Sequence, residues 1–350
     1  MKTGQGYGGV PLIPFLLAGC PAACRGELHF YRDEGRIMAQ AVQQLSRAKS
    51  WLLAVRPWAY GASIMPVLLG IALTFYSGHK IDWFLFAITL VGVVSFHTAA
   101  NLLNDCFDHK RGLDVKVYPS SGAIVRGLLT EGQVFRAGLL FSVIGVMCGF
   151  YLVYISGWQV FALGVIGAVL ALGYTSSGVC LKYAGFGDLA IFIAFGILPV
   201  FGTYWVQVQK YSWMPVLWSV PVASYTVGIL HANNWRDMAG DSVKNCTTLA
   251  GLLGEGGSRL YYRMLVLGPL MLVSGLVLIA FVMNRTHAAP MTSLLVLLAL
   301  PMGLKLISIN RINDPGVFVM LDGKTAQMGM VFGLMLTLAF VVARLLERFN

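Results

Sequence analysis

Two short stretches of the chain place asparagine and aspartate side chains at helical spacing. In the first stretch, spacings of three and four residues put the side chains on one face of a helix; its members are Asn101, Asn104, Asp105 and Asp108. Asp114 follows just past the expected end of that helix. Carboxylates packed this closely repel each other, and a divalent cation relieves the repulsion. Because Mg²⁺ commonly binds one or two carboxylates together with substrate phosphate oxygens, this stretch predicts a magnesium and phosphate site.

A second stretch repeats this arrangement later in the chain. Asn234, Asp237 and Asp241 are again three and four residues apart, so they also share a helix face. A simpler alternative is that each acid merely lies at a solvated helix end. Two clusters with the same spacing favour a shared site, since ionisable groups that face the interior of a membrane bundle are usually functional. The expected metal ligands are Asp105, Asp108, Asp237 and Asp241.

Several cations near the clusters could bind a diphosphate, whose departure builds negative charge on its oxygens. These candidates are Lys110, Arg111, Arg126, Lys182 and Arg236. Lys182 and Arg236 are favoured, because Lys182 follows the segment Gly-Tyr-Thr-Ser-Ser-Gly and Arg236 lies within the second cluster. For each basic residue, a role in membrane topology or lipid contact is an equal alternative.

Three more polar residues lie close to the clusters in the sequence. Asp188 either contacts a substrate or metal, or caps the helix that is expected to begin beside it. His97 and His231 lie about one turn inside the two clusters. We expect both histidines to make buried polar contacts rather than to act as catalytic bases.

Membrane-spanning helices must position these residues. The 350-residue chain is 57% hydrophobic and 11% charged, with a mean hydropathy of +0.73, whereas soluble domains carry about 25% charged residues. The net charge of +10 comes without a long basic run, which argues against nucleic acid as a partner. Nine apolar stretches are long enough to span a bilayer as helices. They are about 58–77, 83–103, 134–155, 158–176, 187–208, 213–233, 261–283, 290–309 and 325–345. We therefore expect an all-α polytopic membrane bundle of nine transmembrane helices.

The connections between these stretches alternate between short ones and long polar ones. All the long connections therefore lie on one side of the membrane. Most lysines and arginines lie in these connections and in the N-terminal segment, so the positive-inside rule assigns both to the cytoplasmic side. Both Asn/Asp clusters then open on the cytoplasmic surface, and the C-terminus faces outward. We expect residues 1–50 to be a leader, disordered or upstream of the true start, before a domain at 51–350.

The two clusters resemble the paired aspartate-rich motifs of the UbiA superfamily of intramembrane prenyltransferases. The first motif is similar to Asn104-Asp105-x-x-Asp108 with Gly112-x-Asp114, and the second to Asn234-x-Arg236-Asp237-x-x-x-Asp241. The family pattern also fits Arg56-Pro57-Trp58, Tyr174 with Lys182-Tyr183, and Gly185-Phe-Gly-Asp188. The resemblance covers nearly the whole chain beyond the leader, and it implies nine helices around a central cavity that opens laterally to lipid.

Within the superfamily, Asn101-Leu-x-Asn-Asp and His-x-Asn-Asn-x-Arg-Asp are most similar to the MenA branch. Members of that branch prenylate 1,4-dihydroxy-2-naphthoate, with loss of its carboxylate, on the route to menaquinone. The resemblance thus implies Mg²⁺-dependent transfer from a polyprenyl diphosphate to this aromatic acceptor, by a multi-pass protein of the cell inner (cytoplasmic) membrane in contact with membrane lipids.

The resemblance also implies a role for each site residue. The metal ligands would be Asp105, Asp108, Asp237 and Asp241; the substrate-binding residues would be Asn101, Asn104, Asn234, Arg236, Arg126, Asp114 and Asp188. Lys182 would contact the diphosphate, and Tyr174 would steady an allylic cation through its ring face.

Two alternatives stay open. The same chemistry could serve another acceptor, such as 4-hydroxybenzoate, homogentisate or a haem. A protein of another class, a cation- or proton-coupled transporter, could use the acids as a relay, although transporters usually place such groups near the bilayer midplane.

Overall fold

The computed structural model describes residues 46–110, 122–175, 181, 184–243, 247–309 and 314–349. Within these ranges the chain is helical, and its only β pairing is one isolated bridge between Ala184 and Thr247. The all-α prediction is therefore confirmed. Most of the predicted leader lies outside the described residues, and helix α2 already begins at Arg47.

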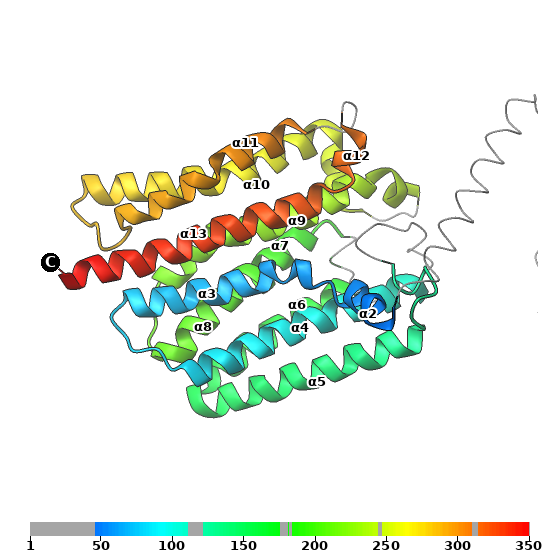
Figure 1. The fold of residues 1–350 in the computed structure, drawn as a ribbon, viewed down its shortest axis with the longest axis horizontal. Helices are drawn as coiled ribbons and strands as arrows, with labels where there is room; N and C mark the ends of the chain where they lie inside the picture. Colours follow the sequence, from blue (N-terminus) through cyan, green and yellow to red (C-terminus); the bar gives the residue numbers. More distant parts are fainter. Residues whose placement is uncertain are drawn as a thin grey trace, which may run out of the picture.

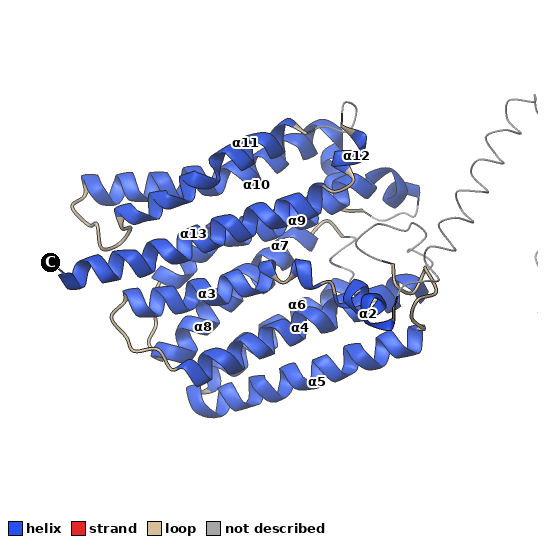
Figure 2. Ribbon diagram, viewed as in Figure 1, coloured by secondary structure: helices blue, strands red, loops and turns tan. Residues whose placement is uncertain are grey.

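The described elements form a bundle of long helices that run roughly side by side (Figures 1 and 2). In chain order they are α2 (Arg47–Val55), η2 (Pro57–Ala59), α3 (Gly61–Tyr76), α4 (Trp83–Lys110), α5 (Glu131–Ser156), α6 (Trp158–Thr175), α7 (Gly187–Ile191), η4 (Phe192–Ile197), α8 (Leu198–Val208), α9 (Met214–Val243), α10 (Leu249–Val282), η5 (Met291–Ala299), α11 (Leu300–Ser308), α12 (Pro315–Phe318) and α13 (Leu321–Phe349). The short helices α2 and α12 lie at one end of the bundle, and the C-terminus lies at the other (Figure 1).

Each of the nine predicted apolar stretches is helical, but fewer than nine segments qualify as spans. Among the described residues, six segments are long and apolar enough to cross a membrane: α4, α5, α7 to α8, α10, η5 to α11, and α13. A seventh is the pair formed by α2 and α3, which is bent by 45°. The apolar part of α6 is short, and α9 is diluted by Pro, Ser and Thr. These helices indicate a multi-pass membrane protein with six or seven spans, and the predicted nine are not confirmed. The choice of membrane and the orientation of the termini stay predictions.

The core of the bundle lies between α3, α9, α10 and α13. The ring centroids of Trp218 and Phe340 are 4.8 Å apart, and Tyr225 lies at the same distance from Phe332. The Tyr225 hydroxyl donates to the backbone carbonyl of Val266 at 2.9 Å, which satisfies a polar group inside this apolar core. By contrast, α5, α6 and α10 expose large apolar side chains on their outer faces. Such extended apolar surface fits contact with lipid rather than water.

Two long helical segments are broken, and glycines mark the breaks. The segment from α7 to α8 contains the π-helical turn η4, where Gly196 packs against α9. A Cβ atom on Gly196 would lie 2.1 Å from the Cβ and 2.8 Å from the Cα of Ala223. In α10, Gly254 takes φ 65° and ψ −175°, and Ser258 Oγ bridges the break by donating to the Ala250 carbonyl at 3.1 Å. Glycine is needed at both places, for space at the first and for positive φ at the second.

We predict that Gly196→Ala destabilises the protein by about 1–3 kcal/mol, because the added methyl group forces η4 away from α9. The change is measured as a lower thermal unfolding midpoint of the purified protein in detergent. Gly275→Ala is the matched control, since a Cβ at Gly275 in α10 meets no other atom within 4 Å. Equal midpoints for the two variants would contradict the close approach of η4 and α9.

Candidate functional site

The two Asn/Asp clusters lie at the same end of the bundle. Helix α3 runs antiparallel to α4, because Tyr60 Oη is 2.6 Å from Thr98 Oγ1 and Ser63 Oγ hydrogen-bonds His97 Nδ1. The first turn of α3 is therefore level with His97, and Asp105 lies roughly two turns further along α4.

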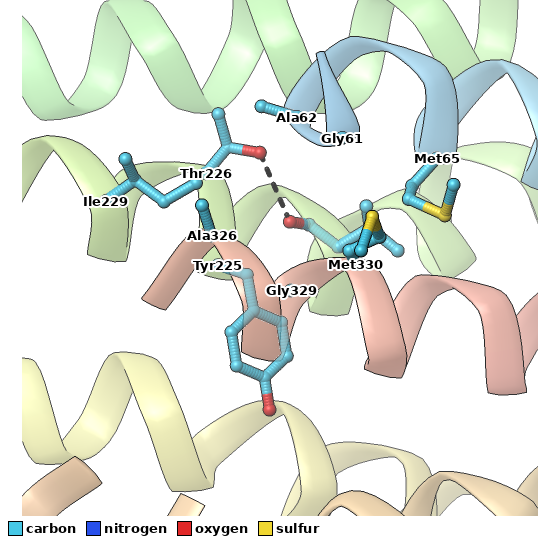
Figure 3. A pocket seen from close by; sticks show the side chains of 10 residues that line it. Gly61, Ala62, Met65, Tyr225, Thr226, Ile229, Ala326, Gly329 and Met330 are labelled. Carbon is cyan, nitrogen blue, oxygen red and sulfur yellow. Dashed lines mark hydrogen bonds between the residues drawn. The ribbon is translucent and has the colours of Figure 1, made fainter. Parts of the chain in front are cut away.

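Side chains of α9 also lie beside the start of α3. Gly61, Tyr225 and Thr226 line one small cavity together with residues of α13 (Figure 3), in which Thr226 Oγ1 donates to the Val222 carbonyl at 3.5 Å. Asp237 lies roughly three turns beyond Thr226. Both clusters thus extend past the start of α3, towards the end where α2 and α12 lie (Figure 1).

This small cavity is not a substrate site. Its volume is about 10 Å³, which is about the room that one water molecule needs. The sequence predicts a large central cavity for substrates, and that expectation stays a prediction.

In the first cluster, Asp105 is bound by an arginine that the sequence analysis did not assign to the site. Arg56 Nη2 donates to Asp105 Oδ1 at 2.6 Å, and the Asp105 side chain is only 10% exposed. Arg56 joins α2 to η2 in a left-handed conformation, φ 55° and ψ 58°, which is rare for a residue with a Cβ. The following Pro57 disfavours the right-handed helical conformation at Arg56. The Arg-Pro pair was the only sequence signal for this contact.

The other members of the first cluster surround Asp105 on α4. Asn101, Asn104 and Asp108 are half-buried, and the Asn101 amide nitrogen is buried with no hydrogen-bond partner in the described part of the chain. Asp114 lies outside the described residues. The four α4 residues therefore lie within the last turns of one helix, and Arg56 contacts one of them, Asp105; their sharing of one site stays a prediction.

In the second cluster, the Arg236 guanidinium is hydrogen-bonded to protein carboxylates, and its predicted contact with the diphosphate stays a prediction. Its Nε and Nη2 donate to the two oxygens of Asp237 at 3.3 and 2.9 Å, and Nη1 donates to Asp322 Oδ2 at 3.0 Å. Asn233 Oδ1 and the Val319 carbonyl accept further hydrogen bonds from the same guanidinium. The guanidinium is only 10% exposed, and its hydrogen bonds to Asp237 orient that carboxylate.

The rest of the second cluster lies on the same last turns of α9. Asn234 is buried, with 5% of its surface exposed. Asp241 belongs to the helix, but its side chain lies outside the described part. Trp235, the residue before Arg236, anchors this part of the helix, because its Nε1 donates to Glu255 Oε2 at 3.0 Å.

Asp188 pairs with a histidine instead of capping a helix. It lies in the first turn of α7 but makes no cap hydrogen bond, and its Oδ2 is 3.7 Å from His231 Nδ1. The Nε2 of His231 lies 3.3 Å from the Ser258 carbonyl, so Nε2 carries a hydrogen. The Tyr261 ring packs edge-on against His231 and lies beside the Asp188 carboxylate. The expected buried polar contacts of His231 and His97 are both confirmed.

The remaining candidates are only partly placed. Lys182 and Arg111 lie outside the described residues, and Tyr174 and Arg126 are half-buried. Lys110 turns away from the acids of its own helix, since its Nζ is 3.0 Å from Glu131 Oε1 and 5.8 Å from the centre of the Phe135 ring on α5. An anion-binding role for Lys110 is therefore not supported.

The donor chemistry of the two clusters fits Mg²⁺. All the candidate ligands are carboxylate or amide oxygens, which this hard cation prefers. Asp105 and Asp108 lie in the last turns of α4, and Asp237 and Asp241 in the last turns of α9. The macrodipole makes a helix C-terminus negative, which disfavours carboxylates there and favours cations. Among the described side chains, no three His, Cys, Asp or Glu residues converge into one ligand group, so the shared metal centre stays a prediction.

Comparison with known proteins identifies the relatives of this chain. The model of the UbiA prenyltransferase family matches residues 63–321. Three similar proteins are all called UbiA prenyltransferase domain-containing protein 1. The one from Rattus norvegicus is 32% identical over 313 residues, which are 89% of this chain and 88% of that protein. Those from Homo sapiens and Xenopus tropicalis are 32% and 31% identical over 299 residues, with 85% of this chain and 85% and 83% of theirs covered. These names do not support the narrower MenA assignment, and none supports a transporter.

Solved structures with low sequence identity share the fold. A UbiA homologue from Aeropyrum pernix K1 aligns with a TM-score of 0.58 at 14% identity, covering 82% of this chain and 98% of that one. A UbiA homologue from Archaeoglobus fulgidus, solved with GPP and Mg²⁺, aligns with a TM-score of 0.54 at 10% identity and covers 82% and 99%. The family match, the relatives and the position of the two acidic helix ends agree that this chain belongs to the UbiA prenyltransferase family.

Proposed function

We propose that this protein transfers a prenyl group from a prenyl diphosphate to an aromatic ring, at the end of the bundle where the two Asn/Asp clusters lie. The observation that carries the proposal is the pair of acidic helix ends, on α4 and α9, that both extend past the start of α3. The UbiA homologue from Archaeoglobus fulgidus has been solved with GPP and Mg²⁺ and with DMAPP and Mg²⁺, which supports the same pair of ligands here.

Asp105, Asp108, Asp237 and Asp241 are the residues that would hold Mg²⁺. The bound metal neutralises charge on the departing diphosphate. Arg56 and Arg236 fix the carboxylates of Asp105 and Asp237 through hydrogen bonds at 2.6 and 2.9 Å. Each carboxylate has about four lone-pair sites, so an arginine contact leaves acceptor capacity for a metal.

The remaining polar residues would bind the diphosphate. Asn101, Asn104 and Asn234 line the same helix faces as the acids and would bind diphosphate oxygens beside the metal. Arg126, together with Lys182 and Asp114, which lie outside the described residues, would complete the diphosphate site.

In the reaction, the C–O bond to the diphosphate breaks and the allylic carbon forms a C–C bond with the ring. The ring then loses a proton, or CO₂ where it carries a carboxylate at that carbon. Water must be kept from the allylic carbon, and the apolar bundle below the site can exclude it. Tyr174 would face the developing positive charge, and Asp188 is held near this region by His231.

The acceptor we propose to test first is 1,4-dihydroxy-2-naphthoate, because the sequence around Asn101 and His231 resembles the branch that uses it. The names of the relatives do not specify an acceptor, so 4-hydroxybenzoate, homogentisate and haem remain in the comparison. A transporter is disfavoured, because the acids lie at one end of the bundle and transporters place such groups near the midplane.

We predict that Asp105→Asn reduces prenyl transfer by at least about 100-fold, because it removes the charge of a metal ligand while keeping the size of the side chain. Activity is measured in isolated membranes by mass spectrometry of the prenylated product. Asp82→Asn is the control. Asp82 caps the opposite end of α4 through hydrogen bonds from the Phe84 and Leu85 amides at 2.9 and 3.0 Å, and asparagine caps helices equally well. Retained activity in Asp105→Asn would contradict the proposed metal site.

A second prediction concerns metal and acceptor together. The purified protein, given a prenyl diphosphate and 1,4-dihydroxy-2-naphthoate, should form a product whose mass shows the added prenyl group and the lost CO₂. A chelator should abolish this product, and an excess of Mg²⁺ should restore it. A product only with another acceptor would overturn the choice of acceptor. No product with any of the four acceptors would overturn the proposed function.

A further inference from the structure

Arg236 lies between two carboxylates, and only one of them belongs to an Asn/Asp cluster. Its Nη2 is 2.9 Å from Asp237 Oδ2, and its Nη1 is 3.0 Å from Asp322 Oδ2. Asp322 is far away in the sequence, in the first turn of α13. It also lies just outside the family match, which ends at residue 321. Neither the sequence motifs nor the family gives it a role.

The structure fixes Asp322 firmly against the end of α9. The Gly323 amide donates to Asp322 Oδ1 at 2.8 Å, which orients the carboxylate. In the next turn, Thr325 is 2.6 Å from the Tyr262 hydroxyl on α10, so the start of α13 cannot turn freely. On the α9 side, the Trp235 ring packs edge-on against Phe318 with centroids 4.9 Å apart. The residues that flank Asp322 are thus docked onto α9 and α10.

This geometry has an electrostatic consequence for Asp237. A guanidinium that donates two hydrogen bonds to one carboxylate forms a strong pair that largely cancels the carboxylate's charge. Here the single positive charge is shared with a second carboxylate, so Asp237, Arg236 and Asp322 together keep a net negative charge. The second carboxylate lies at a helix N-terminus, where the macrodipole stabilises it, while Asp237 lies near a C-terminus.

We propose that Asp322 is a positioning residue that shares Arg236 and so leaves Asp237 with the negative charge that a divalent cation requires. The inference rests on the proposed function, because it takes Asp237 as a metal ligand. It assigns Asp322 no contact with metal or substrate. Its effect passes through Arg236, which holds Asp237 in place.

The test measures metal binding directly, apart from catalysis. Mn²⁺ is titrated into the purified full-length protein, and the free ion is followed by electron paramagnetic resonance. Asp322→Asn keeps the side-chain size and an oxygen that can accept from Arg236, but it removes the charge. We expect it to weaken Mn²⁺ binding roughly 10-fold, as loss of partners behind metal ligands typically does. Asp322→Ser also lacks the charge and suits a helix N-terminus, so it should weaken binding to the same extent, whereas Asp322→Glu should bind as the wild type does.

Two comparisons separate this role from general electrostatics. Asp314→Asn removes the same charge at the start of α12, at the same end of the bundle, and should leave Mn²⁺ affinity unchanged. In an Arg236→Gln background, Asp322→Asn should have a much smaller effect than in the wild type, because the residue through which it acts is gone. Unchanged affinity in both Asp322→Asn and Asp322→Ser, or an equal loss in Asp314→Asn or in the Arg236→Gln background, would overturn the inference. If the wild type itself binds no Mn²⁺, the proposed function fails with it.

Discussion

Two helices of this protein end in carboxylates, and a helix end is an unfavourable place for them. The C-terminal ends of α4 and α9 already carry the negative end of the macrodipole, and each adds two aspartates within its last turns. The structure offsets this charge with one arginine on each helix end, Arg56 on Asp105 and Arg236 on Asp237. Arg56 comes from the joint between α2 and η2. The connection from α12 to α13 completes the contacts of Arg236, because the Val319 carbonyl accepts a hydrogen bond from it. A residual negative charge at both ends would attract a divalent cation, which in turn would bind the oxygens of a diphosphate.

The packing of the helices explains why the two acidic helix ends lie at the same end of the bundle. Helices α4 and α9 both run antiparallel to α3, so their C-terminal ends extend past its start. The apolar contacts of Trp218, Tyr225, Phe332 and Phe340 hold α3, α9, α10 and α13 together behind the site. The helices break at Gly196, where α9 packs closely, and at Gly254, where the Ser258 side chain spans the gap. Membrane helices tolerate such breaks because their neighbours satisfy the freed polar groups.

Two residues that contact the Asn/Asp clusters or their arginine lie just outside the stretch that the family model matches. The family match covers residues 63–321, which include both Asn/Asp clusters and the Asp188 and His231 pair. Arg56 precedes the match and Asp322 follows it. The residues that contact the carboxylate of Asp105 and the guanidinium of Arg236 therefore lie outside the stretch that the family model matches. A change in such supporting residues could alter metal affinity without altering the motifs themselves.

The sequence by itself determined the elements and the direction of the site. Hydropathy predicted nine stretches that are helical, but neither α2 nor α12. Helical spacing put Asn101, Asn104, Asp105 and Asp108 on one face, and the alternation of spans predicted that both clusters open at one end. Hydropathy and helical spacing are local properties of the sequence, and the end at which a cluster opens follows from counting the predicted membrane crossings. The predicted nine spans are not confirmed, because α6 and α9, a short helix and a more polar one, do not qualify by length and composition among the described residues.

Only the tertiary structure decided which charges meet. Arg56 and Asp105 are 49 residues apart in the sequence, and Arg236 and Asp322 are 86 residues apart. Sequence reasoning assigned Arg236 to the diphosphate and gave Arg56 and Asp322 no place in the site. It could not choose between a helix cap and a contact for Asp188, whose partner His231 lies on another helix. Long side chains pair with whatever charge the packing of helix ends brings within about 3 Å, and that approach is not encoded in any local pattern.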